Sequence, residues 1–256
     1  MELLAQARVV IWEGGALWVV DATRPAAPGR STDLHAHHAI QVTIGLGGRF
    51  RLETTNGHVG GEAVAVAADV GHTFQAEGLF AILFAAPESR LGRAITARFF
   101  QASDLSSIPR DMLGDFPERI AALFRAGGRN EEALIAQGRG LISHLAADVR
   151  ADVPDLRVRK VIAWAGQRLD GPLGLVEAAA VAGLSAGRLR HLFVEHTGLP
   201  FKSFVLWLRL MRALERFAAG RSLTEAAHEA GFSDSAHLSR TFRRMFGVAP
   251  AGLRMT

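Results

Sequence analysis

The stretch LTEAAHEAGFSDSAHLSRTFRRMFGVAP, residues 223–250, repeats a pattern that occurs earlier in the chain. The segment EAAAVAGLS at 177–185 returns as EAAHEAGFS at 225–233, an offset of 48 residues. Beyond these segments the offset becomes 49, so that Gly198 matches Gly247. Two copies of one small helical unit explain this self-similarity.

Each copy contains the parts of a helix-turn-helix. The pattern predicts a short Ala-rich helix at 176–182 and another at 223–230, each ended by a glycine that adopts left-handed backbone at little cost. Ser185 and Ser233 are then expected to cap a second helix in each copy. The buried stripe of these second helices is expected to comprise Leu189, Leu192 and Phe193 in the first copy, and Leu238 and Phe242 in the second.

The other face of each second helix is rich in arginine. Arginine pairs with the O6 and N7 atoms of guanine or clamps a phosphate, whereas an isolated surface arginine is usually only a solvated charge. Because the second helix of both tandem units carries several arginines, the pattern favours DNA binding. The candidate residues are Gly187, Arg188, Arg190, His191 and His196 in the first copy, and Ser235, Ala236, His237, Ser239, Arg240, Arg243 and Arg244 in the second.

A long amphipathic helix is predicted between the copies, at 200–220. At ~1.5 Å per residue it spans roughly 30 Å, close to one turn of B-DNA. This spacer is expected to hold the two second helices in successive major grooves. The residues expected to face inward are Phe204, Trp207, Leu208, Met211, Leu214 and Phe217.

The region from about residue 158 to residue 254 resembles the DNA-binding domain of the AraC/XylS family of transcriptional regulators. The resemblance is carried by LVEAAAVAGLSAGRLRHLFVEHTGLPF and by the stretch at 223–250. It implies a double-stranded DNA operator as partner, RNA polymerase as a second partner if the protein is an activator, and a homodimer. It also implies that positions 187, 190 and 191, and positions 235, 236, 237 and 240, face the bases, although Gly187 and Ala236 are too short for much direct readout.

Charge and composition agree with a two-part chain. The 256 residues are 49% hydrophobic and 21% charged, which is typical of a globular protein of about two domains. Residues 1–150 carry a formal charge of −2 and the remainder +6. The absence of cysteine excludes disulfide scaffolds, thiol nucleophiles and Cys-ligated zinc.

Residues 8–87 have the pattern of a β-barrel or sandwich, because short apolar runs alternate with Gly-, Asp- and Pro-rich turns. Helices are expected over 90–150, specifically at 91–102, 117–126 and 131–149. We therefore predict an α+β protein: a sensing and dimerising domain at 1–150, a linker at 151–157, and an all-helical domain at 158–256. The six strands are expected at VVIW, ALWVV, AIQVTI, RFRLET, EAVAVAA and LFAILF.

One apolar stripe has two interpretations. Leu134, Leu141, Leu145 and Val149 lie at roughly helical spacing in the third of these helices. The stripe is either a dimer seam or a face that packs on the barrel.

The segment at 29–48 reads G-x5-H-A-H-x3-Q-x6-G and resembles the first motif of the cupin barrels, with Gln41 where metal-binding cupins have Glu. Of the second motif, Gly61 and His72 fit, whereas Ala67, Asp69 and Ala76 replace the expected residues. AraC-type regulators commonly carry such a barrel as the effector-sensing domain, so this second resemblance supports the first.

Two ligands remain open for this region. His35 and His37 repeat at the two-residue period of a strand and therefore share a face, and with His72 they offer three imidazoles to a divalent metal ion. The alternative is a small-molecule effector pocket around His35, His37, Gln41 and His72. His38 points the other way and is expected to pack or to lie at the surface. The aromatic residues that could line the pocket, although most of them are expected to pack in the core, are Trp12, Trp18, Phe50, Phe74 and Phe84.

The sequence thus predicts a cytoplasmic, effector-responsive, DNA-binding transcriptional regulator that is not an enzyme. No charged leader followed by a cleavage site is visible, and the apolar runs fall short of the ~20 residues that a bilayer requires. No G-x-S-x-G motif is present. The alternative is a metal-dependent cupin enzyme that carries a DNA-binding appendage.

Overall fold

The computed structural model describes residues 5–22, 31–55, 57–128 and 130–255. By its internal contacts the chain divides into two compact units. The first unit comprises residues 1–87, 91–151 and 239–256, and the second comprises 88–90 and 152–238. The predicted sensing domain at 1–150 and DNA-binding domain at 158–256 differ from this division, because residues 239–256 group with the sheet.

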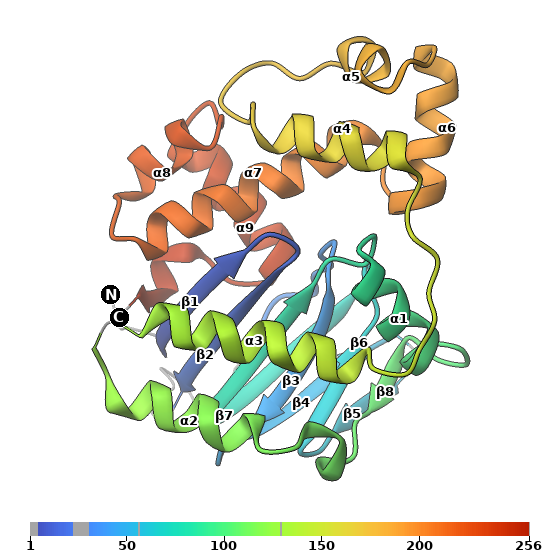
Figure 1. Ribbon diagram of the computed structural model, residues 1–256. Helices are drawn as coiled ribbons and strands as arrows, with labels where there is room; N and C mark the ends of the chain where they lie inside the picture. Colours follow the sequence, from blue (N-terminus) through green and yellow to red (C-terminus); the bar gives the residue numbers. More distant parts are fainter. Residues whose placement is uncertain (1–4, 23–30, 56, 129, 256) are drawn as a thin grey trace. The chain divides into compact units, whose positions relative to one another are not determined.

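The first unit is built on one mixed sheet (Figure 1). Its strands follow the order β8-β6-β3-β7-β2-β1-β9, with β4 pairing both β5 and β7. All of these pairs are antiparallel except that of β1 with β9. The strands are β1 Ala5–Trp12, β2 Gly15–Ala22, β3 Ile40–Gly45, β4 Arg49–Thr54, β5 Gly57–Gly60, β6 Ala63–Val66, β7 His72–Ala85, β8 Leu105–Ser107 and β9 Leu253–Met255.

All six predicted strands are present, as β1, β2, β3, β4, β6 and β7, but the predicted closed barrel is wrong. In the described part of the chain no pairing joins β8 to β9, so the sheet stays open. The cause lies in β7, whose residues 72–77 pair with β4 whereas residues 78–85 pair with β2 and β3. The sheet therefore branches where a barrel would close.

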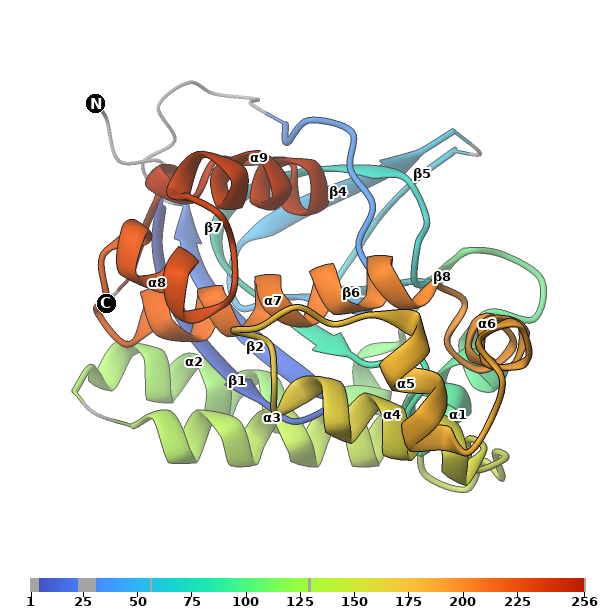
Figure 2. The same cartoon turned by 90° about the horizontal axis from the view of Figure 1, so that it is seen from above.

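Helices cover one face of this sheet. Helix α3 contacts β1, β2 and α2, and Figure 2 shows α2 and α3 side by side. Leu134, Leu141 and Leu145 are at most 1% exposed in the core of the unit, and Val149 packs against it. The stripe is therefore a packing face of the first unit, and its interpretation as a dimer seam is wrong. The helices of this region are α1 Arg90–Phe99, the 3-10 turn η1 Arg110–Leu113, α2 Phe116–Ala126 and α3 Glu131–Leu145.

The remaining helices follow the predicted repeat. Two pairs of short helices, α5 with α6 and α8 with α9, are separated by the long helix α7, whose buried residues include Phe204, Trp207 and Leu214. The bounds are α4 Leu156–Gly166, α5 Leu175–Ala182, α6 Ala186–Thr197, α7 Phe201–Ala218, α8 Leu223–Glu229, α9 Ser235–Phe246 and the 3-10 turn η2 Pro250–Gly252.

The two short first helices end in the same way. Gly183 follows α5 with φ 65°, and Gly231 follows α8 with φ 78°. The next residue in each copy donates its backbone N–H to a carbonyl five residues earlier, Leu184 to Ala179 and Phe232 to Ala227, both at 2.9 Å. The sequence repeat is thus also a repeat of backbone geometry.

Two arginines of α7 bind backbone within the second unit. Arg209 donates to the carbonyl oxygens of Leu169 and Gly171 at 3.0 and 2.6 Å, and Arg212 donates to Gly166 at 2.9 Å. These bonds hold α7 to the end of α4 and the segment after it. In the described ranges, no helix is long and apolar enough to cross a membrane.

Substitution of the two equivalent glycines by alanine is expected to have unequal effects. Both residues have positive φ, which costs an L-residue about 1–2 kcal/mol. A Cβ at Gly183 meets nothing within 4 Å, whereas a Cβ at Gly231 overlaps the carbonyl oxygen of Leu169. Gly183→Ala should therefore lower the free energy of unfolding by about 1–2 kcal/mol and Gly231→Ala by roughly 3 kcal/mol or more. Urea denaturation followed by circular dichroism measures both, and equal losses would contradict the packing argument.

Candidate functional site: two helix faces and a histidine-lined pocket

Helix α6 exposes the residues predicted to read DNA in the first copy. Ser185 caps the helix as predicted, because its hydroxyl accepts the backbone N–H of Arg188 at 3.3 Å. Leu189 and Phe193 are fully buried on the inner side. Four of the five candidate residues of this helix are exposed, namely Gly187, Arg188, Arg190 and His191, whereas His196 is half-buried.

Helix α9 begins differently from the prediction. Asp234, not Ser233, caps it, because its Oδ1 accepts the backbone N–H of His237 at 2.6 Å. A carboxylate is a good acceptor for the first free N–H groups of a helix, so it takes the place of the neighbouring hydroxyl. The ring of His237 also lies edge-on to Phe232, with ring centres 5.2 Å apart.

The exposed face of α9 is narrower than predicted. Ala236 and Arg240 are exposed, whereas Ser235 and His237 are half-buried. Arg243 is exposed, but its Nε lies 2.7 Å from Oδ2 of Asp33 in the first unit. The Asp33 carboxylate raises the pKa of Arg243 further above its usual value. A residue predicted to bind DNA is thus engaged in an ion pair that the sequence did not reveal.

A pocket lies within the first unit. Its cavity is about 320 Å³ and its walls are largely aromatic and aliphatic. Trp18, Phe74 and Phe84 line it, although most of the five aromatic candidates were expected to pack in the core, and Trp12 and Phe50 are not among the lining residues. The polar lining groups include His35, Gln41, Thr32, Asp33 and Arg243, and Phe246 to Ala249 contribute one wall.

The last turn of α9 is fixed against the sheet of the same unit. Trp18 lies 4.8 Å from Phe246 and 6.2 Å from Phe242 between ring centres. The backbone N–H of Asp33 donates to the carbonyl oxygen of Gly247 at 2.9 Å. Sequence reasoning assigned residues 242–247 only to the helical repeat, because no local pattern indicates which apolar residues of a helix meet a distant sheet.

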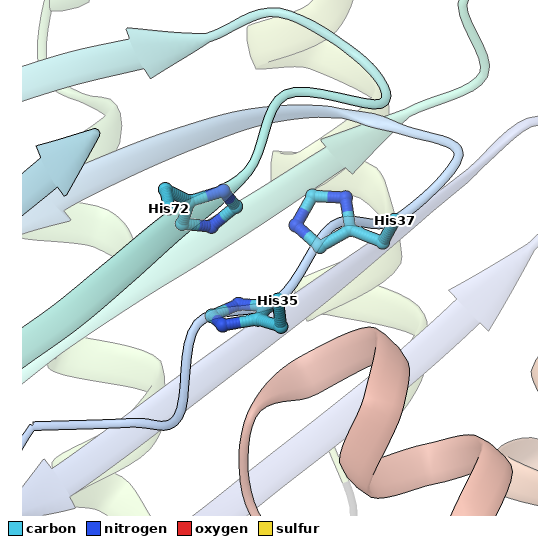
Figure 3. A group of neighbouring side chains, drawn as sticks. All are labelled: His35, His37 and His72. Carbon is cyan, nitrogen blue, oxygen red and sulfur yellow. The ribbon is translucent and has the colours of Figure 1, made fainter. Parts of the chain in front are cut away.

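Three histidines lie close together beside this pocket (Figure 3), but of the predicted pocket residues only His35 and Gln41 line the cavity, and His37 and His72 do not. One ring nitrogen from each of His35, His37 and His72 lies within 4.8 Å of the other two. The three side chains, here called the histidine cluster, are at most 6% exposed. The structure therefore brings together the three residues that the motif analysis had singled out.

Backbone and side-chain acceptors orient the rings of the histidine cluster. Nδ1 of His35 lies 2.8 Å from the carbonyl oxygen of Asp33, and Nδ1 of His72 lies 2.9 Å from that of Val70. Neutral rings donate N–H to these carbonyls, which leaves each Nε2 with a free lone pair. Nε2 of His72 is buried, with no hydrogen-bond partner in the described chain.

Gln41 serves as an orienting group beside the histidine cluster. Its Nε2 donates to the hydroxyl of Thr43 at 3.0 Å, and its Oε1 lies 2.9 Å from Nε2 of His37. The fixed amide thus presents an acceptor to the imidazole. His38 is buried and forms a 2.9 Å hydrogen bond with Asp69, so it packs apart from the histidine cluster, as predicted.

Burial keeps the histidine cluster neutral at physiological pH. Desolvation, reinforced by the neighbouring His72, lowers the pKa of His35 to about 4 and that of His37 to about 3. Desolvation also lowers the pKa of His72. Neutral imidazoles are the form that binds a metal ion or accepts a hydrogen bond from an effector.

We expect the metal-free protein to lose stability as pH falls from about 6.5 towards 4. The unfolded chain binds protons on His35 and His37 near pH 6.5, whereas the folded chain does not until about pH 4 or lower. At pH 5 the free energy of unfolding is lower than at pH 7 by about 2 kcal/mol for each of these two histidines. Urea denaturation in chelator-containing buffer at pH 7 and pH 5 measures it. His37→Gln should reduce the pH dependence and the exposed control His58→Gln should not; equal slopes in all three proteins would contradict the assignment.

Comparison with known proteins shows similarity to HTH-type transcriptional regulators, and the chain spans only about a third of the length of the first of these relatives. Residues 178–256 match the family model of a helix-turn-helix domain. A segment of 108 residues is 33% identical to the uncharacterised HTH-type transcriptional regulator YidL of Escherichia coli K12, covering 42% of this chain and 36% of YidL. A segment of 186 residues is 26% identical to the HTH-type transcriptional activator RhaS of Klebsiella pneumoniae, covering 64% of this chain and 67% of RhaS.

Among solved structures, ToxT from Vibrio cholerae O395 shares the fold. Its TM-score is 0.59 at 12% sequence identity, over 94% of this chain and 96% of ToxT. ToxT has also been crystallised with a bound unsaturated fatty acid. The chain therefore combines an N-terminal sheet unit with a C-terminal helix-turn-helix domain that is similar to those of HTH-type transcriptional regulators.

Proposed function

We propose that this protein is a sequence-specific DNA-binding transcriptional regulator that responds to an effector bound in its sheet unit. The observation that carries the proposal is the paired exposure of Arg190 on α6 and Arg240 on α9, in two helix pairs with the same backbone geometry. Each helix pair acts as a helix-turn-helix, and the two exposed faces enter successive major grooves of an operator.

The residues assigned to the DNA interface fall into two classes. Arg190, His191 and Arg240 have the length and exposure to reach base edges, whereas Arg188 and Arg243 suit phosphates. The remaining predicted positions shape the helix surfaces and let the helix backbones approach the DNA closely: Gly187, Ser235, Ala236 and His237.

The pocket of the sheet unit is the proposed effector site. Its aromatic walls and its few polar groups, among them His35 and Gln41, suit a small molecule with an apolar body and a polar end. We also propose that the protein is a member of the AraC/XylS family and that its open sheet unit is related to the cupins, as the motif containing His35, His37 and His72 indicates. We further propose a cytoplasmic homodimer that contacts RNA polymerase if it activates transcription.

A metal-dependent cupin enzyme with a DNA-binding appendage is the second candidate from the sequence. Neither YidL nor RhaS is named as an enzyme, and both are named as HTH-type regulators. We therefore retain regulation as the proposed function, without catalysis.

Arg190→Ala and Arg240→Ala should each weaken binding to the operator by ~1–3 kcal/mol and relax specificity at one base position. The operator is obtained by selection from genomic DNA with the full chain, and fluorescence anisotropy measures the affinities. Arg51→Ala, at an exposed position on β4, is the matched control. Unchanged binding and specificity in both variants would show that these helix faces do not read DNA.

Asp33→Asn should strengthen operator binding by up to about fivefold. If Arg243 contacts a phosphate it must leave Asp33, and an exposed ion pair of this kind is worth ~0–1 kcal/mol. The control Asp104→Asn removes the same charge from an exposed position of the same unit. The gain of Asp33→Asn over this control should vanish in an Arg243→Ala background, and its persistence there would exclude competition for Arg243.

A further inference from the structure

We propose that the histidine cluster binds one divalent first-row transition metal ion, and that this ion is a signal to which the proposed regulator responds. The regulatory half of the inference rests on the proposed function, whereas the binding half does not. The donors are one ring nitrogen each from His35, His37 and His72.

The spacing of the donors suits a metal ion. Imidazole nitrogens bind zinc at about 2.0–2.1 Å, so three of them around one ion lie roughly 3 Å apart. The ring nitrogens of the histidine cluster already lie within 4.8 Å of one another. Binding therefore requires the three rings to move closer together, and rotation of the side chains supplies part of that movement.

A buried atom without a partner indicates that the cluster is incomplete by itself. His72 is only 1% exposed, so water does not reach its Nε2, and this atom also lacks a hydrogen-bond partner among the described residues. Leaving a buried polar atom unsatisfied costs about 1–3 kcal/mol. A metal ion at the centre of the histidine cluster supplies the missing partner.

The surroundings have the groups that hold metal-binding histidines in place. Metal ligands of this type donate their other N–H to a backbone carbonyl or a side-chain oxygen, which fixes the ring and its tautomer. Asp33 and Val70 provide such carbonyls to His35 and His72, and Gln41 provides its amide oxygen to His37. Gln41 is therefore a positioning residue, which explains why an amide suffices where a metal-binding cupin has a carboxylate.

The donor set and the pocket define the class of ion. Three neutral imidazoles without thiolate favour Zn²⁺, Ni²⁺, Co²⁺ or Fe²⁺ over hard ions such as Mg²⁺ and Ca²⁺. Because His35 and Gln41 line the cavity, an ion bound here faces the pocket with room for a water molecule or an effector atom as a further ligand.

The histidine cluster also touches the end of α9. A Cβ built at Gly247 would lie 2.6 Å from Nδ1 of His35, so the backbone of Gly247 packs directly against that ring. The ring of Phe246 lies 6.0 Å from that of His37 between centres. Movement of these imidazoles onto an ion must therefore shift or tighten the last turn of α9.

Binding is tested on the full chain, without DNA, by titration with Zn²⁺ and Co²⁺. Calorimetry should show one equivalent of Zn²⁺ with Kd below about 1 μM, and Co²⁺ should give visible d–d absorption. Zn²⁺ at 100 times Kd should raise Tm by about 5–10 °C. The absence of saturable one-to-one binding would overturn the proposal.

Three variants locate the site. His72→Gln should weaken Zn²⁺ binding more than 100-fold, Gln41→Ala should weaken it 10- to 100-fold, and exposed His58→Gln should leave it unchanged. Circular dichroism and Tm in chelator check that His72→Gln is folded. If it is not, Co²⁺ spectra of His35→Gln provide the same test. Wild-type affinity in a folded ligand variant would exclude the cluster as the site.

The regulatory half is tested with the selected operator. Zn²⁺ should change the operator affinity at least fivefold in the wild type and not in His72→Gln. One-to-one binding with unchanged operator affinity would overturn the regulatory role and leave the metal site standing. Failure of the apo and metal-bound chains to bind any DNA would instead contradict the proposed function.

Discussion

Two backbone hydrogen bonds between His35 and His72 are the constraint on which the pocket depends. The N–H of His35 donates to the carbonyl of His72 at 3.0 Å, and the N–H of His72 donates back at 2.8 Å. This isolated bridge joins the segment before β3 to the start of β7. Because the backbone carries the pairing, the rings are brought together whether or not a ligand is present, and the site is organised before binding.

The fold was predictable to the extent that local patterns encode it. Apolar or alternating runs identified six strands, and the repeat at 177–185 and 225–233 identified both helix pairs. The strands β5, β8 and β9 were missed because they are short and, unlike the equally short but wholly apolar β6, contain no apolar run. The open sheet was missed because β7 changes partners along its length, which is a property of pairing and not of composition.

In the candidate sites, too, local sequence patterns were predictable and contacts between distant residues were not. His35, His37 and His72 were found from motif spacing, and the exposed face of α6 was found from helical periodicity. The pairing of Arg243 with Asp33 was not predictable, since the partners are 210 residues apart and each alone resembles an ordinary surface charge. Asp234 caps α9 in place of the predicted Ser233, because the sequence offers two adjacent polar side chains and does not show which of them accepts the backbone N–H of His237.

The two copies of the repeat pack their equivalent residues differently. Phe193 packs edge-on against Phe201 and Phe204 within the helical unit, whereas its counterpart Phe242 lies against Trp18 of the sheet unit. Gly198 has nothing within 4 Å of a hypothetical Cβ, but its counterpart Gly247 is crowded by Asp33 and His35. The end of the second copy is therefore tied to the sheet of its own unit at positions where the first copy packs among helices or lies open.

The stiffness of a helix gives this contact a consequence along α9. Helix α9 runs for 12 residues, about 18 Å, with Arg240 near its middle and Phe246 at its end. A helix of this length moves as one body, so a change at Phe246 and Gly247 displaces Arg240 as well. Any ligand that favours one arrangement of the last turn therefore changes the free energy of presenting the face of α9 that is proposed to read DNA by the same amount. The coupling is reciprocal: operator binding must change the affinity for that ligand by the same factor, which separates a regulatory ligand from one that merely fills the pocket.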